Sequence, residues 1–134
     1  MDLKMTHEEF LRTPIAQAIW EDRYALKDKS GNLIEKTIFE TFDRVATAVA
    51  SQEKHSQQWK ENFNWMMANK YFCPAGRILA HSGTHYQQLL NCFVLPFRDD
   101  SLEEIMHTAS DIAIIQKQGG GTGMNYSTLR PEGS

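Results

Sequence analysis

A strand–helix–strand pattern within residues 89–128 limits the folds that this chain can adopt. A nearly continuous apolar run of strand length, Leu89-Leu90-Asn91-Cys92-Phe93-Val94-Leu95, ends at Pro96. A capping box at Ser101–Glu104 then opens a helix with one apolar stripe, and the segment Met124–Ser127 beyond it is extended in character. So apolar a run suits a strand covered on both faces, as in a parallel sheet. The order predicts one βαβ unit with a right-handed crossover, and therefore an α/β fold.

Residues 1–70 are predicted to be helical. Capping boxes begin at Thr6 and Thr37, Thr13-Pro14 marks another helix start, and Lys29–Asn32 has the composition of a turn. At Tyr71-Phe72-Cys73-Pro74-Ala75-Gly76, proline and glycine interrupt the helical periodicity. We therefore divide the chain into a helical region, 1–70, and an α/β region, 71–134. Three histidines lie among polar residues of the helical segments and are expected at the surface: His7, His55 and His107.

Composition bounds the class of protein. The chain has 134 residues, 14 basic and 17 acidic, so its net charge of −3 argues against binding to nucleic acid or anionic lipid. A hydrophobic fraction of 41% is typical of a globular domain, and no apolar run approaches the ~20 residues of a membrane span. Met1–Lys4 does not open a signal peptide, and two cysteines are too few for a disulfide scaffold. We expect a cytoplasmic protein with reduced thiols and neither a nucleic-acid nor a membrane partner.

Four glycines cluster within residues 119–123. Phosphate-binding loops run from a strand into a helix, whereas this cluster follows a helix and precedes a strand. It lacks the Lys-Ser/Thr of a P-loop, and Met124 stands where a dinucleotide fingerprint requires its last glycine. One interpretation is a helix cap at Gly119 followed by a plain turn. The other, favoured by the number of glycines, is a backbone that a ligand approaches closely.

Cys92 also has two readings. A single thiol in an apolar strand is most often inert and buried, yet its neighbour Asn91 is polar and hints at a site. A zinc site formed by Cys73, His81, His85 and Cys92 is disfavoured, because their spacing matches no common zinc motif. We therefore predict no metal site. The sequence also contains no recognisable Ser-His-Asp or paired-carboxylate constellation.

Several segments, taken together and in order, resemble a known family. They are Trp20-Glu21-Asp22-Arg23-Tyr24, Pro74–Ala80, Ser82-Gly83-Thr84, Asn91–Pro96, Asp100-Ser101, Gly119–Gly123 and Ser127–Ser134. Each is weak alone, but their shared order is specific. Across residues 14–134 the chain resembles the amino-terminal part of the large chain of ribonucleotide reductases, most closely the adenosylcobalamin-dependent class.

The resemblance implies a helical region followed by the start of a ten-stranded α/β barrel, whose first strand contains Asn91 and Cys92. Cys92 would be one of two cysteines that reduce the substrate and end as a disulfide, while the ribose 2′-hydroxyl leaves as water. The backbone around Asn91 would touch the ribose, and Gly119 and Gly120 would lie against the substrate. The loop Pro74–Leu79 would lie beside the substrate phosphates.

Within that loop, Gly76 and Arg77 would be substrate-binding residues, with Arg77 as a charge partner. The implied cofactor is adenosylcobalamin, bound mainly by the remainder of the enzyme, where it would generate a thiyl radical. The implied partners are a ribonucleotide substrate, the remainder of the reductase chain and a thioredoxin-like reductant.

In the family, the radical cysteine, the second reducing cysteine and the effector loops lie downstream of the matched segments. We therefore expect an amino-terminal fragment with a truncated barrel, inactive alone, arising from a shortened sequence, an intein or a split gene. One alternative is a fragment of an iron- or manganese-dependent (class I) large chain, which would use the same Cys92. The other is a non-catalytic α+β interaction domain.

Overall fold

A computed structural model describes residues 5–86 and 88–133. The expectations for Met1–Lys4 and for Ser134 lie outside these residues. The chain forms two compact units, Met1–Leu89 and Leu90–Ser134, and each is described by itself. Residues 71–89, grouped above with the α/β region, belong to the first unit. No helix in the described part of the chain is long and apolar enough to cross a membrane.

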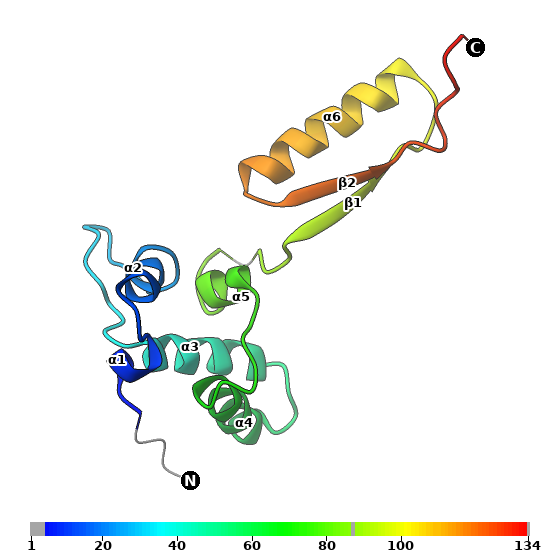
Figure 1. Ribbon diagram of the computed structural model, residues 1–134. Helices are drawn as coiled ribbons and strands as arrows, with labels where there is room; N and C mark the ends of the chain where they lie inside the picture. The colour runs from blue at the N-terminus through cyan, green and yellow to red at the C-terminus, as the bar shows by residue number, and fades with distance from the viewer. Residues whose placement is uncertain (1–4, 87, 134) are drawn as a thin grey trace. The chain divides into compact units, whose positions relative to one another are not determined.

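The first unit is helical (Figure 1). Its helices are α1 (His7–Phe10), α2 (Pro14–Arg23), α3 (Ile38–Ala50), α4 (Ser56–Ala68) and α5 (Gly76–His81). Their core is a cluster of buried side chains: Trp20, Ala25, Ile38, Phe42, Val45, Ala46, Met67, Ala68 and Leu79. The helix starts expected at Thr6, Thr13 and Thr37 are confirmed, because each threonine hydroxyl accepts a hydrogen bond from a backbone N–H three residues on.

The surface position expected for His7 is wrong. His7 is 9% exposed, its Nδ1 accepts a hydrogen bond from the backbone N–H of Ile38 at 3.0 Å, and its ring lies edge-on to Trp20. The imidazole therefore satisfies an N–H group at the start of α3, where the first turn has no intrahelical acceptor. His55 and His107 are exposed, as expected.

The segment Pro74–Leu79 is not a loop throughout, because α5 begins at Gly76. Ala75 is extended, its carbonyl accepts from the N–H groups of Ile78 and Leu79, and the buried Leu79 side chain anchors the turn in the core. Proline lies before the helix, where it costs no hydrogen bond, so the interruption in the pattern marks a helix start.

The second unit is a βαβ unit, as predicted. Strand β1 (Cys92–Pro96) pairs in parallel with β2 (Gly121–Asn125), and α6 (Leu102–Lys117) connects them (Figure 1). The first strand begins three residues later than the apolar run, and the second begins inside the glycine cluster rather than after it. The register pairs Cys92 with Gly121 and Pro96 with Asn125.

Only one face of this two-stranded sheet is covered within the described residues. The burial of β1 alternates, with Phe93 and Leu95 partly covered and Cys92 and Val94 exposed. Because successive side chains in a strand point to opposite faces, Phe93 lies on the α6 face and Cys92 on the other. The expectation of cover on both faces is thus not met here, and Val94 is 82% exposed.

Candidate functional site

Cys92 lies on the open face of the sheet, at the first residue of β1. It is a free, exposed thiol, and its Sγ would lie 3.5 Å from a Cβ added at Gly121, its partner in the register. The buried, inert thiol considered above is therefore not what this unit shows. The thiol is accessible from the side of the sheet opposite α6.

Two glycines of β2 leave the space beside Cys92 and Val94 free of β2 side chains. Gly121 and Gly123 alternate with Thr122, so they point to the same face as Cys92 and Val94, and a Cβ at Gly123 would meet nothing within 4 Å. Gly119 and Gly120 are the site residues predicted from the sequence, and Gly121 and Gly123 are not among them. The signal was the alternation Gly-Thr-Gly at the start of a strand, which places two glycines on one face.

The backbone turn at the end of α6 accounts for the glycines at positions 119 and 120. Gly119 has φ +77°, and its N–H donates to Gln116 O, while the N–H of Gly120 donates to Ile115 O. This pair of bonds is a Schellman motif, so the helix cap expected at Gly119 is confirmed. A Cβ at Gly120 would lie 2.6 Å from Ile115 Cγ2, so the close approach there is made by α6. Their contact with substrate stays a prediction.

Asn91 lies directly before β1, and its carbonyl oxygen accepts a hydrogen bond from the N–H of Gly121 at 2.8 Å. A carbonyl oxygen has two lone pairs, so one remains for a ligand hydroxyl. Asn91, Cys92, Gly119 and Gly120 thus come together at one end of the β1–β2 pair. Gly76 and Arg77 lie on α5 in the helical unit, so they belong to a different unit from these four residues.

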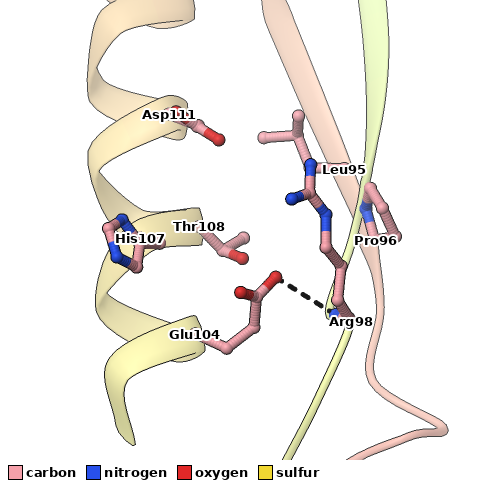
Figure 2. A pocket seen from close by; sticks show the side chains of 7 residues that line it. All are labelled: Leu95, Pro96, Arg98, Glu104, His107, Thr108 and Asp111. Carbon is pink, nitrogen blue, oxygen red and sulfur yellow. Dashed lines mark hydrogen bonds between the residues drawn. The ribbon is translucent and has the colours of Figure 1, made fainter. Parts of the chain in front are cut away.

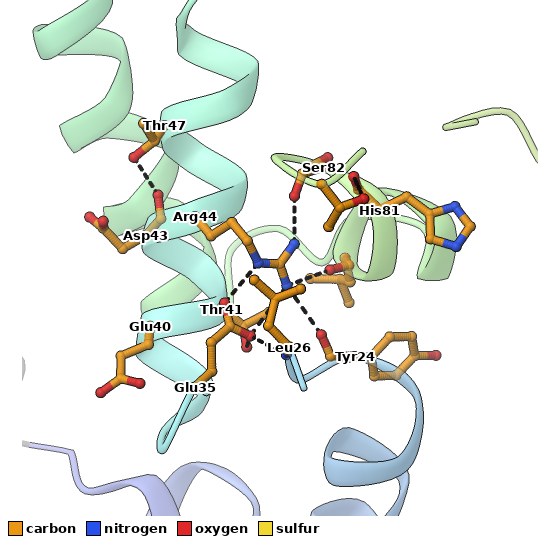
Figure 3. A network of polar contacts seen from close by, with 12 residues as sticks. Tyr24, Leu26, Glu35, Glu40, Thr41, Asp43, Arg44, Thr47, His81 and Ser82 are labelled. Carbon is orange, nitrogen blue, oxygen red and sulfur yellow. Dashed lines mark hydrogen bonds and ion pairs between the residues drawn. The ribbon is translucent and has the colours of Figure 1, made fainter. Parts of the chain in front are cut away.

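The helical unit contains a buried ion pair that the sequence analysis missed (Figure 3). Arg44 Nε lies 2.7 Å from Glu35 Oε1, and the two side chains are 10% and 7% exposed. Burial alone would raise the pKa of Glu35. Hydrogen bonds from Arg44, the Leu26 N–H and the Thr41 hydroxyl, together with the charge of Arg44, outweigh it and hold that pKa below its ordinary value of 4.5.

The same guanidinium reaches three backbone carbonyls from other segments. Arg44 donates to Ser82 O at 2.6 Å, Leu79 O at 3.0 Å and Tyr24 O at 3.1 Å. It therefore joins the end of α2, helix α3 and the end of α5. Gly83, with φ +72°, passes so close that an added Cβ would lie 2.9 Å from Arg44 Cγ.

A polar hollow of about 370 Å³ lies beside α6 in the second unit (Figure 2). Its lining includes Arg98, Glu104, His107 and Asp111, and the Glu104 carboxylate accepts from the backbone N–H of Arg98. Leu95, on the α6 face of β1, also lines it, so it opens on the side of the sheet opposite Cys92. Across residues 5–86 and 88–133, no three His, Cys, Asp or Glu side chains gather to hold a metal ion.

Asp100 forms an ion pair with Arg130 in the second unit. Its Oδ2 lies 2.6 Å from Arg130 Nε, and its carbonyl accepts from Arg130 Nη2. The pair fixes the segment after β2 to the start of α6. Two pieces of the sequence resemblance that are 30 residues apart, Asp100-Ser101 and Ser127–Ser134, are thus in contact.

Comparison with known proteins identifies both units. Residues 10–87 match the family model described as the ribonucleotide reductase all-alpha domain, and residues 90–134 match the ribonucleotide reductase barrel domain. The junction of the two matches falls at the junction of the two compact units. The prediction of a helical region followed by the start of the barrel is confirmed.

Individual relatives agree with this. A vitamin B12-dependent ribonucleoside-diphosphate reductase of Mycobacterium tuberculosis is 40% identical over 88% of this chain, and one of Thermoplasma acidophilum is 38% identical over 78%. A ribonucleoside-diphosphate reductase large chain of Saccharomyces cerevisiae is 36% identical over 52%. The matched segments span 18%, 13% and 8% of these relatives. The chain belongs to the ribonucleotide reductase large-chain family.

Proposed function

We propose that this chain is the amino-terminal portion of a ribonucleotide reductase and supplies one substrate-reducing thiol, Cys92. The observation that carries the proposal is the position of that thiol on the open face of β1, beside the side-chain-free Gly121 and Gly123. In a barrel, the face opposite the connecting helix is the interior. Cys92 would then point into the substrate cavity. The match of this unit to the barrel domain supports that orientation.

The proposed reaction consumes two thiols for each substrate. The ribose C2′–OH bond breaks, C2′ gains hydrogen and the hydroxyl leaves as water, while the two thiols supply two electrons and two protons and their sulfurs join in a disulfide. Cys92 supplies one thiol. Cys73 lies in the helical unit, and we propose no redox role for it. The second thiol would come from the part of the enzyme that this chain does not cover, and a thioredoxin-like reductant would restore both.

The remaining site residues fill out a substrate wall in this proposal. The Asn91 carbonyl accepts from a ribose hydroxyl, and the backbone at Gly119 and Gly120 lies against the substrate. Gly76 and Arg77 on α5 face the phosphates, where a guanidinium pairs well with a diphosphate. Residues 1–70 would support this wall, and 71–134 would form it. The names of the relatives favour ribonucleoside diphosphates as substrates.

We propose adenosylcobalamin as the cofactor of the whole enzyme. Its support is the names of the relatives that match 78–88% of the chain. When bound, the cofactor would supply the initiating radical. On the open face of β1 and β2, the described residues present no charged anchor and do not form a cobalamin cradle. The reducing environment that keeps Cys92 a thiol is that of the cytoplasm.

The test is a chimera in which this chain replaces the matched segment of the Mycobacterium tuberculosis relative, assayed with adenosylcobalamin, nucleoside diphosphate and a dithiol. Deoxynucleotide formation is expected, whereas the chain alone should show none. Cys92→Ser should abolish turnover, because no disulfide can form. Cys73→Ser is the matched control and should retain it. Turnover by the Cys92→Ser chimera would overturn the proposal. The cofactor is tested on the full-length enzyme that contains this chain: turnover without cobalamin, in the presence of a radical-generating partner, would indicate the iron- or manganese-dependent class.

A further inference from the structure

We propose that Arg44 is a positioning residue that fixes α5, with Glu35 holding the guanidinium in place. The inference rests on the proposed function, in which α5 carries Gly76 and Arg77 to the substrate phosphates. It adds a residue from α3 that has no direct part in the substrate wall. The Glu35–Arg44 pair would set where α5 lies within the helical unit.

Arg44 binds the backbone at the end of α5. A helix leaves its last carbonyl groups without intrahelical partners, and a six-residue helix has few others. Arg44 Nη2 donates to Leu79 O and Nη1 donates to Ser82 O (Figure 3). A cation at a helix C-terminus is also favoured by the helix dipole. The contacts are to backbone atoms, so they fix the path of the chain itself.

Arg44 is also connected, through Tyr24, to the start of α5. Arg44 Nη2 also donates to the carbonyl oxygen of Tyr24 at 3.1 Å, and the Tyr24 hydroxyl would lie 3.2 Å from a Cβ added at Gly76. Tyr24 thus packs against the first residue of α5 while its backbone is held by Arg44. Both ends of the helix are located relative to one guanidinium.

Glu35 fixes the orientation of the Arg44 guanidinium. Glu35 binds it through two oxygens, Nε to Oε1 at 2.7 Å and Nη2 to Oε2 at 3.3 Å. The carboxylate in turn accepts from the Leu26 N–H and the Thr41 hydroxyl, which itself accepts from Trp20 Nε1. A planar guanidinium that donates hydrogen bonds to five acceptor oxygens is fixed in one orientation. Lysine keeps the charge but cannot span these acceptors.

Hydrogen exchange in the full 134-residue chain tests the positioning. Arg44→Lys should raise the exchange rates of amides in residues 76–84 by about tenfold or more, with little change in α4. Asp43→Asn is the matched control, since Asp43 neighbours Arg44 on α3 but pairs with Lys60 of α4. It should leave residues 76–84 unchanged. The double variant Glu35→Gln/Arg44→Gln removes both charges, leaves neither unpaired, and should also loosen α5. Unchanged exchange in residues 76–84, or an equal rise in α4, would overturn the inference.

The kinetic readout uses the chimera described above. Arg44→Lys should raise KM for the nucleoside diphosphate by about fivefold or more while kcat changes little, since a displaced phosphate wall weakens ground-state binding. A purely structural role would lower the amount of active enzyme and leave KM unchanged, and that result would overturn the inference. The proposed function fails by a different result, turnover of the Cys92→Ser chimera, so the two failures are distinguishable.

Discussion

Gly83 has a backbone conformation that side chains rarely adopt, with φ +72°, and lies against the Arg44 side chain. Gly83→Ala should lower the free energy of unfolding by about 2–3 kcal/mol, because the left-handed conformation costs roughly 1–2 kcal/mol and the new Cβ displaces Arg44. Gly31→Ala is the control, since φ is +86° but nothing lies within 4 Å. It should show the conformational cost alone in urea unfolding. Equal losses for both variants would mean that Arg44 can move freely.

Polar residues that become buried on folding could not be predicted from the sequence. Glu35 and Arg44 are nine positions apart, belong to no common motif, and have side chains that are usually exposed. Their burial depends on α2, α3 and α5 meeting, which no local pattern encodes. The prediction that His7 lies at the surface was wrong for the same reason. Cys92 was found because a family resemblance singled it out; the strand pattern alone left its role open.

Among the elements, the junction of α6 and β2 makes a sharp test of which glycines are structural. Gly120→Ala should destabilise the chain by about 1–3 kcal/mol, because its Cβ would lie 2.6 Å from Ile115 Cγ2 and 3.0 Å from Phe93 Cε2. Gly123→Ala, with free space around it, should change stability by less than about 1 kcal/mol. Thermal unfolding of the two variants measures the difference. A Gly120→Ala protein as stable as Gly123→Ala would contradict the packing described.

Four helix starts were predicted well, whereas the start of α5 and the limits of the strands were not. The caps at Thr6, Thr13, Thr37 and Ser101 depend on contacts within four residues, so the sequence contains the whole interaction. A strand is defined by its partner. The extent of β2 follows from the pairing of Gly121 with Cys92, whereas the sequence predicted an extended segment only from Met124. The same pairing placed Gly121 and Gly123 beside the thiol.

For the whole chain, the two units show how far pattern and resemblance reach. The order of motifs predicted the helical region and the βαβ unit, and the structure confirms both. The family matches identify them as the all-alpha domain and the start of the barrel domain. The division at 70–71 followed composition, whereas the compact units meet at residues 89 and 90. The difference is α5, whose helix starts after Pro74 and whose Leu79 side chain packs into the helical core. Composition marks where helical periodicity breaks, but packing decides to which unit a segment belongs.

Acid should destabilise the chain through one buried carboxylate. The pKa of Glu35 is lowered in the folded state, so its contribution to stability is complete above 4.5 and is lost as the pH falls through the folded pKa. Urea unfolding measured as a function of pH should show this loss. Glu35→Gln should make the free energy of unfolding depend less on pH in acid. At neutral pH the same variant should lower that free energy by about 3 kcal/mol or more, because it leaves Arg44 buried without its counter-ion.

The control for this effect is Asp28→Asn. The pKa of Asp28 is also lowered, by hydrogen bonds from the Asn32 side chain and from backbone N–H groups, but Asp28 lies in an exposed turn. Solvent screens an exposed carboxylate, so the variant should change the acid limb much less than Glu35→Gln. If the two variants shifted the pH dependence equally, the acid sensitivity would be spread over surface carboxylates. The Glu35–Arg44 pair would then hold α5 without dominating the stability of the helical unit.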